Sequence, residues 1–192
     1  MSITQIGTIV GVQMPYSIGL YFDQITETIV KTLWQQLAEM GLADYYHVSG
    51  NRPHITVRIY NDLYVSEAEK ILYQFSQSKR HIPISFQHIG LFNGLDNTVF
   101  WAPVVTQELL AHHSELENLF RQAGATPGLE YYAPGNWIPH CGLAMQVTRN
   151  ELVPQIIEVC QSLPNPHAGQ ITEIGLIKFR PVEHLCSFSL KK

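Results

Sequence analysis

Along residues 52–58 polar and apolar side chains alternate, in the order Arg-Pro-His-Ile-Thr-Val-Arg. A two-residue period is typical of a strand that is buried on one face. The apolar positions would face the core. The opposite face would carry three polar side chains: His54, Thr56 and Arg58. A second Pro-His pair opens another such strand at residues 139–146. We therefore expect two strands that each begin with a histidine.

The hydrophobic pattern predicts an alternation of strands and helices along the whole chain. Apolar residues recur at helical spacing in residues 25–40 and 108–123, and a glycine suited to a C-cap follows each run. Capping boxes, in which Ser or Thr stands three residues before Glu, begin two more helices: residues 66–78 from Ser66 and 148–163 from Thr148. The other strands are predicted at residues 6–12, 81–92, 98–105, 170–179 and 184–190.

The order of these elements repeats once. The Tyr-Tyr pairs begin at residues 45 and 131 and the Pro-His pairs at 53 and 139, so both recur after 86 residues. Ile-Gly-Leu recurs after 85 residues and the capping boxes after 82. Markers in one order at a nearly constant offset favour an internal duplication over chance. We expect a single domain built from two β-α-β-α-β units, about residues 1–95 and 96–192, related by a pseudo-twofold axis.

Composition narrows the class of protein. The chain has 192 residues, 45% of them hydrophobic, which is enough for a substantial core. Its apolar runs are too short to span a membrane, and residues 1–5 do not read as a secretory leader, so we expect neither feature. With three widely spaced cysteines, these features predict a cytoplasmic protein. A net charge of −4 favours a small ligand or the end of a polynucleotide over an extended duplex, which basic proteins usually bind.

A pseudo-twofold axis would bring equivalent residues face to face, so that His54 and His140 would meet across a cleft. Histidine both takes and gives a proton near neutral pH. Two histidines on opposite sides of a phosphate suit in-line displacement, with a base on the attacking oxygen and an acid on the leaving oxygen. Thr56 would donate a hydrogen bond to a phosphate oxygen, and Arg58 would offset the phosphate charge.

These residues resemble the two-histidine (2H) phosphoesterase superfamily, which includes 2′-5′ RNA ligase-like proteins and cyclic phosphodiesterases. The resemblance rests on two His-x-Thr/Ser-x motifs: His54-Ile55-Thr56-Val57, matched in full, and His140-Cys141-Gly142-Leu143, matched in part. It implies a bilobal α+β fold, each lobe an antiparallel sheet with flanking helices, and an active-site cleft between the lobes. It also implies an enzyme that opens or forms 2′,3′-cyclic phosphates or 2′-5′ phosphodiester bonds of RNA, without a metal or other cofactor. His54 and His140 would be its acid–base pair, and Thr56 a phosphate-oxygen donor.

Gly142 departs from the family pattern, which has Thr or Ser at this position. The two-residue period places Gly142 on the face of His140, whereas Cys141 would point toward the core. Loss of one preorganised donor lowers a rate by roughly 10²–10³. Three consequences are open. A water or another side chain fills the gap, Gly142 makes room for a bulkier substrate group, or activity is reduced or lost.

Tyr132 and Trp137, in the loop before the second motif, are candidates for a substrate contact through base stacking. The remaining histidines form no HExxH pattern and no cysteine–histidine cluster, so we expect no metal site. We expect a monomer that acts on an RNA end or a small nucleotide. The main alternative is a module that binds a nucleotide or RNA end without turnover, because of Gly142. A further alternative is an enzyme for small cyclic nucleotides or ADP-ribose cyclic phosphate.

Overall fold

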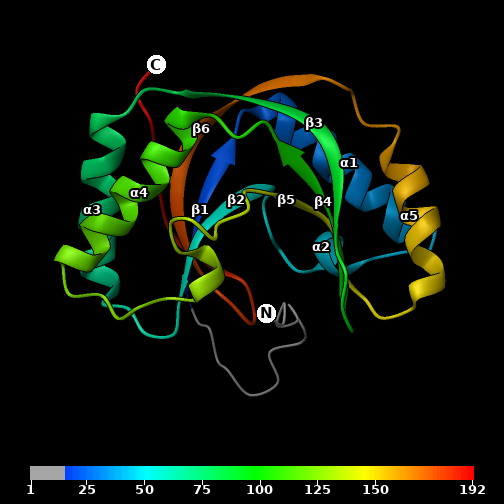
Figure 1. Ribbon diagram of the computed structural model, residues 1–192, viewed down its shortest axis with the longest axis horizontal. Coiled ribbons are helices and arrows are strands. Elements are labelled where there is room, and N and C mark those ends of the chain that lie inside the picture. Colours follow the sequence, from blue (N-terminus) through cyan, green and yellow to red (C-terminus); the bar gives the residue numbers. More distant parts are fainter. Residues whose placement is uncertain (1–15) are drawn as a thin grey trace.

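The computed structural model describes residues 16–192, which form an antiparallel sheet flanked by helices (Figure 1). Within these residues the strands are β1 (Tyr16–Phe22), β2 (His54–Tyr60), β3 (Ile82–Phe92), β4 (Asn97–Pro103), β5 (Cys141–Val147), β6 (His167–Lys178) and β7 (Glu183–Ser189). The helices are α1 (Gln24–Glu39), α2 (Tyr45–Val48), α3 (Val65–Ser78), α4 (Gln107–Gln122) and α5 (Val153–Cys160), with 3₁₀ turns η1 (Glu130–Tyr132) and η2 (Asn150–Leu152).

Six of these strands close a ring. The strands pair in the order β1-β2-β5-β4-β3-β6-β7, and β1 also pairs with β6. The ring pairings stay the same when β1 is exchanged with β4, β2 with β5 and β3 with β6. The register agrees, because Gly19 on β1 pairs with Thr56 on β2, and Phe100 on β4 pairs with Gly142 on β5. Thr56 and Gly142 are also equivalent by the sequence offset. An internal duplication predicts this symmetry.

The two halves of the sequence exchange strands. β3 of the first half pairs with β4 of the second, and β6 of the second half pairs with β1 of the first. β3 and β6 also pair with each other along five residue pairs, whereas β2 and β5 pair only where Ile55 meets Cys141. The sheet therefore has two lobes, β2-β1-β6-β7 and β5-β4-β3. Helices α3 and α4 lie together on one side of the molecule, and α1 and α5 on the other (Figure 1).

Caps and apolar stripes position the long helices. Asp23 caps α1 by accepting a hydrogen bond from the Thr26 backbone N–H at 2.9 Å, and Thr106 caps α4 by accepting one from Leu109. The buried stripe of α1 has helical spacing: Val30, Leu33, Trp34 and Leu37. These side chains join one hydrophobic core that continues through both lobes.

The expected α+β fold class, with an antiparallel sheet and flanking helices, is confirmed. Both predicted capping boxes are wrong, because Ser66 lies inside α3 and Thr148 precedes η2, and neither caps a helix. The last helix is shorter than predicted and begins at Val153, with a proline in its first turn. The predicted strand at residues 6–12 lies outside the described residues, and the hydrophobic pattern did not predict β1. No helix in residues 16–192 is long and apolar enough to cross a membrane.

Candidate active site

A cavity of about 520 Å³ lies where the two lobes meet, and both motif histidines line it. His54 is the first residue of β2, and His140 immediately precedes β5. The pairing of Ile55 with Cys141 sets the two strands side by side, so each histidine stands one residue before the paired residue of its strand. Three more residues considered above line the same cavity: Thr56, Tyr132 and Gly142.

The two imidazoles are oriented by equivalent hydrogen bonds. Nδ1 of His54 donates to the carbonyl oxygen of Arg52 at 2.6 Å, and Nδ1 of His140 donates to that of Ile138 at 2.7 Å. Because a carbonyl oxygen only accepts, Nδ1 carries the proton of each neutral ring. Nε2 is then the nitrogen of both rings that remains available to a ligand.

Burial lowers the proton affinity of both rings. The pKa of His54 is lowered from 6.5 to about 4, mainly by desolvation; the hydrogen bond to Arg52 opposes this shift and the neighbouring His140 adds to it. Desolvation also lowers the pKa of His140. Both rings are therefore neutral at pH 7. A bound phosphate anion would raise both pKa values, because it stabilises the imidazolium form. By raising the pKa values of His54 and His140, an anionic ligand would thus make it easier for the two rings to accept and donate protons.

Thr56 connects His54 to a buried tyrosine. Its Oγ1 lies 3.2 Å from Nε2 of His54, and the hydroxyl donates this bond because Nδ1 holds the ring proton. The side chain of Tyr132 interacts with that of Thr56, and burial raises the pKa of Tyr132 far above its usual value. The protonated phenol, the hydroxyl and the imidazole therefore follow one another toward Nε2 of His54.

Arg58 does not share the cavity-facing side of β2, and this part of the prediction is wrong. The register between β1 and β2 skips one residue between Thr56 and Arg58, and such a bulge reverses the alternation of side chains. Ile59 lines the cavity instead. Arg58 is only 4% exposed, and its guanidinium forms an ion pair of 3.2 Å with Glu117 on α4. Arg58 therefore belongs to the interior of its lobe.

Trp137, the other residue predicted to contact substrate, does not line this cavity. Its ring stacks on His113 with centroids 4.0 Å apart, and its Nε1 donates to the carbonyl oxygen of Thr56 at 2.9 Å. Trp34 makes the equivalent bond to the carbonyl oxygen of Gly142 at 3.0 Å. Each indole thus donates a hydrogen bond to the backbone of a residue in the other half of the sequence. That residue, Thr56 or Gly142, stands two positions after a motif histidine.

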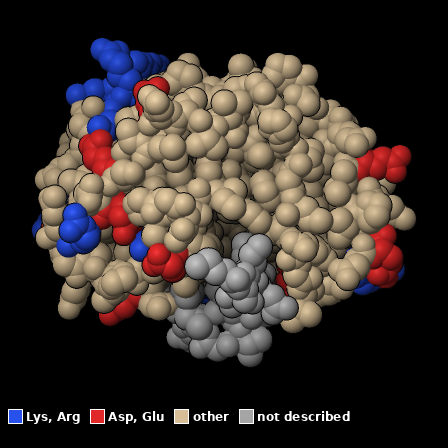
Figure 2. Space-filling view, in the orientation of Figure 1, with Lys and Arg blue, Asp and Glu red and all other residues tan. Residues whose placement is uncertain are grey.

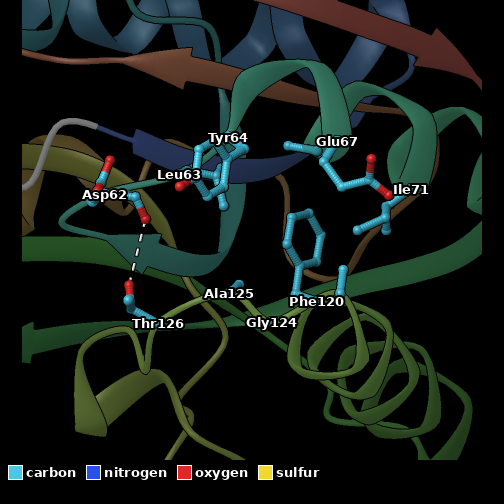
Figure 3. Close-up of a pocket in the computed structure, with 11 residues that line it drawn as sticks. Asp62, Leu63, Tyr64, Glu67, Ile71, Phe120, Gly124, Ala125 and Thr126 are labelled. Carbon is cyan, nitrogen blue, oxygen red and sulfur yellow. Dashed lines mark hydrogen bonds between the residues drawn. The ribbon is translucent and has the colours of Figure 1, made fainter.

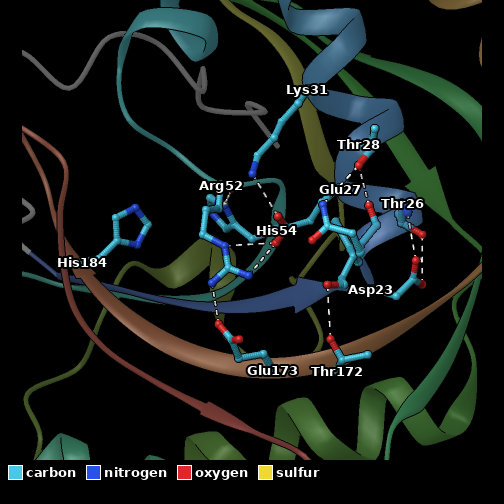
Figure 4. A network of polar contacts seen from close by, with 12 residues as sticks. Asp23, Thr26, Glu27, Thr28, Lys31, Arg52, His54, Thr172, Glu173 and His184 are labelled. Carbon is cyan, nitrogen blue, oxygen red and sulfur yellow. Dashed lines mark hydrogen bonds and ion pairs between the residues drawn. The ribbon is translucent and has the colours of Figure 1, made fainter.

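Ion pairs fix the backbone that holds His54 (Figure 4). The guanidinium of Arg52 contacts Glu27 on α1 at 2.6 Å and also contacts Glu173 on β6. It lies over the ring of Tyr21, 4.3 Å from the centroid. The carbonyl group that orients His54 is therefore part of a loop tied to both α1 and β6.

Arg180 is a cavity residue that sequence reasoning missed. It lies between β6 and β7 and is the only lysine or arginine among the described lining residues. Its exposed guanidinium has no hydrogen bond or ion pair with any of residues 16–192. On the face shown in Figure 2, the lysine, arginine, aspartate and glutamate side chains lie mostly toward the margins. No periodicity could have located Arg180, because only the folded chain brings it to the cleft.

The other features of the described chain offer no comparable site. A pocket of about 50 Å³ lies between the start of α3 and the end of α4, with Phe120 in its wall (Figure 3). It is mainly apolar and too small for a nucleotide. Among residues 16–192, no group of three or more His, Cys, Asp or Glu side chains could hold a metal ion.

Known proteins share this sequence pattern and fold. Residues 26–183 match the family model of the 2′-5′ RNA ligase superfamily. The fold is similar to TT0787 of Thermus thermophilus, with a TM-score of 0.60 at 11% identity, covering 93% of this chain and 98% of that one. It is also similar to E. coli LigT complexed with NADP+, with a TM-score of 0.57 at 10% identity, covering 94% and 99%. For E. coli LigT complexed with 3′-AMP the TM-score is 0.52 at 13% identity, covering 94% and 99%. No curated protein sequence matches the chain.

Proposed function

The chain belongs to the 2′-5′ RNA ligase superfamily of two-histidine phosphoesterases, and we propose that it hydrolyses 2′,3′-cyclic phosphates at RNA ends or opens 2′-5′ phosphodiester linkages. One observation carries this proposal. His54 and His140 line one cavity and donate from Nδ1 to equivalent carbonyl groups, which leaves both Nε2 atoms for the substrate. This arrangement suits a pair of proton-transfer groups on opposite sides of one phosphorus atom.

In the proposed reaction, one neutral imidazole takes a proton from water as the water oxygen attacks phosphorus. The bond from phosphorus to one ribose oxygen breaks on the opposite side, and the other histidine, as imidazolium, gives that oxygen a proton. The product is a phosphomonoester. One histidine has gained a proton and the other has lost one. The two imidazoles supply both the base and the acid. His140 would activate the water when the product is a 2′-phosphate.

The rest of the cavity suits an anionic nucleotide. Thr56 would donate its hydroxyl hydrogen bond to a phosphate oxygen in place of His54, and Arg180 would offset the charge of the phosphate. Tyr45 and Tyr131 line the same cavity and offer aromatic faces on which a base could stack. The LigT structures that hold NADP+ and 3′-AMP support a ligand of this class. A cytoplasmic location and a monomeric state belong to the same proposal.

The proposal is tested with an oligonucleotide that ends in a 2′,3′-cyclic phosphate and with a 2′-5′-linked dinucleotide. His54→Asn and His140→Asn keep an amide donor for the carbonyl group but remove the titrating nitrogen. Each should lower kcat by roughly 10²–10⁴. His88→Asn, a matched change of an exposed histidine on β3, should leave kcat unchanged. Unchanged turnover in either motif variant would contradict the mechanism.

Gly142 motivates one alternative function, a module that binds a nucleotide without turnover. The same assays separate the two, because a binding module would hold 3′-AMP tightly and yield no product from either substrate after long incubation. Turnover that depends on both histidines would exclude this alternative.

A further inference from the structure

The space beside Gly142 is filled by a tyrosine. A Cβ atom added to Gly142 would overlap the phenol oxygen of Tyr46 and would lie 2.8 Å from its Cε2. The backbone of Gly142 does not have the positive φ that favours glycine. The phenol of Tyr46, and not the backbone conformation, therefore excludes a side chain at this position. The end of the phenol therefore fills the space that the Cβ of a Ser or Thr would take.

Stacking holds the Tyr46 ring in this position. The ring lies against the indole of Trp34 with centroids 4.8 Å apart and an interplanar angle of 11°. The same indole donates from Nε1 to the carbonyl oxygen of Gly142 at 3.0 Å. Trp34 thus fixes the phenol and the glycine relative to each other, so the position of the phenol oxygen is preorganised.

The His54 half of the site shows the role of Thr56, the residue equivalent to Gly142. Tyr46 and Tyr132 are equivalent, because each is the second residue of a repeated Tyr-Tyr pair. Gly142 and Thr56 are likewise equivalent positions of the two motifs. Tyr132 interacts with the Thr56 side chain, and the Thr56 hydroxyl lies 3.2 Å from Nε2 of His54. In one half a tyrosine supports a hydroxyl group. In the other half the tyrosine oxygen overlaps the place of the missing Cβ and so lies beside the position of such a side chain.

The Tyr46 phenol is available to a ligand. It lines the cavity together with His140, and it forms no hydrogen bond with any of residues 16–192. Burial raises its pKa well above 10, so the O–H group remains a donor at neutral pH.

We propose that Tyr46 is a catalytic residue whose phenol donates a hydrogen bond to a phosphate oxygen on the His140 side of the cavity, in place of the Thr or Ser of the second motif. This inference rests on the proposed function and adds a residue to it. It answers the question raised by Gly142, since the site then has two hydroxyl donors. It also implies that Gly142→Ser alone would displace Tyr46 and would not raise activity.

The first test is Tyr46→Phe, which removes the hydroxyl and keeps the ring that stacks on Trp34. We expect kcat on the cyclic phosphate to fall roughly 10²-fold with little change in KM. Tyr73→Phe removes an exposed phenol on α3 as a matched control and should have the activity of the wild type. An unchanged kcat in Tyr46→Phe would overturn the inference.

A transplanted hydroxyl is the second test. Tyr46→Ala vacates the space beside Gly142, and Tyr46→Ala/Gly142→Ser places a hydroxyl there from the strand itself. The double variant should recover activity relative to Tyr46→Ala, whereas a further loss would overturn the inference. Circular dichroism and thermal unfolding confirm that the variants being compared are folded.

Phosphate binding distinguishes a failure of this inference from a failure of the proposed function. A wild type that turns over neither substrate contradicts the proposed function, and calorimetric titration with inorganic phosphate then tests Tyr46 directly. Tyr46→Phe should weaken phosphate binding about tenfold, as expected when a hydrogen bond to a charged group is lost. Equal affinities, or no binding to the wild type, would overturn the inference. Turnover that requires both histidines but not the Tyr46 hydroxyl would overturn this inference alone.

Discussion

Acid should destabilise the folded protein through His54. In the folded chain, desolvation lowers the pKa of this imidazole to about 4, whereas the unfolded chain titrates near 6.5. Between these two values the unfolded state binds more protons than the folded state, so the free energy of unfolding decreases as the pH falls. The stability is complete above pH 6.5 and is lost progressively toward pH 4.

The size of the effect follows from the shift. At pH 5 the unfolded imidazole is almost fully protonated, whereas the folded one binds about a tenth of a proton. Integrating this difference from pH 8 gives a loss of at most about 2 kcal/mol from His54. That is a substantial fraction of the stability of an ordinary domain.

Urea unfolding followed by tryptophan fluorescence, at pH 8 and at pH 5, measures the effect. His54→Asn removes the titrating group, and the other histidines contribute to both proteins. The wild type should therefore lose about 2 kcal/mol more than the variant between the two pH values. An equal loss in the two proteins would refute the argument that burial of His54 opposes its protonation.

Two further predictions concern the arginines. Arg58→Met should lower the free energy of unfolding by about 3 kcal/mol in urea titrations, because Glu117 is left as a largely buried, uncompensated charge. The kcat of Arg58→Met per folded molecule should equal that of the wild type. A reduced kcat would show that Arg58 contributes to the active site. Arg180→Gln should raise KM about tenfold at low salt and make KM less sensitive to added salt, since a cation near the phosphate is lost. An unchanged KM would show that this guanidinium does not contact the substrate.

Periodicity predicted most of the fold because it reports burial directly. The first part of β2 and the helices α1 and α4 bury one face or stripe, and the spacing of their apolar residues follows that burial. β1 pairs on both edges and is buried along nearly its whole length, so its sequence has no polar face to mark it. Local sequence patterns also cannot predict the exchange of strands between the halves, because it depends on long-range pairing.

The candidate site was predictable where side chains follow the regular pattern of a strand. His54, Thr56 and His140 line one cavity, as the repeated motif suggests. Arg58 was misplaced because a bulge changes the alternation within β2. The neighbour of Gly142 could not be predicted, because Tyr46 reaches it from the other half of the chain.

If the strand ring were built from two separate, identical chains, its symmetry would prevent the two sides of the site from differing in sequence. Because interchanging the halves leaves the ring pairings unchanged, two identical copies of one half would close the same ring. Such an assembly would carry every substitution twice, so a threonine on one side would require a threonine on the other. In one continuous polypeptide each side varies alone. Thr56 on one side can therefore face Gly142 on the other, and the two oxygens of a reacting phosphate meet different surroundings.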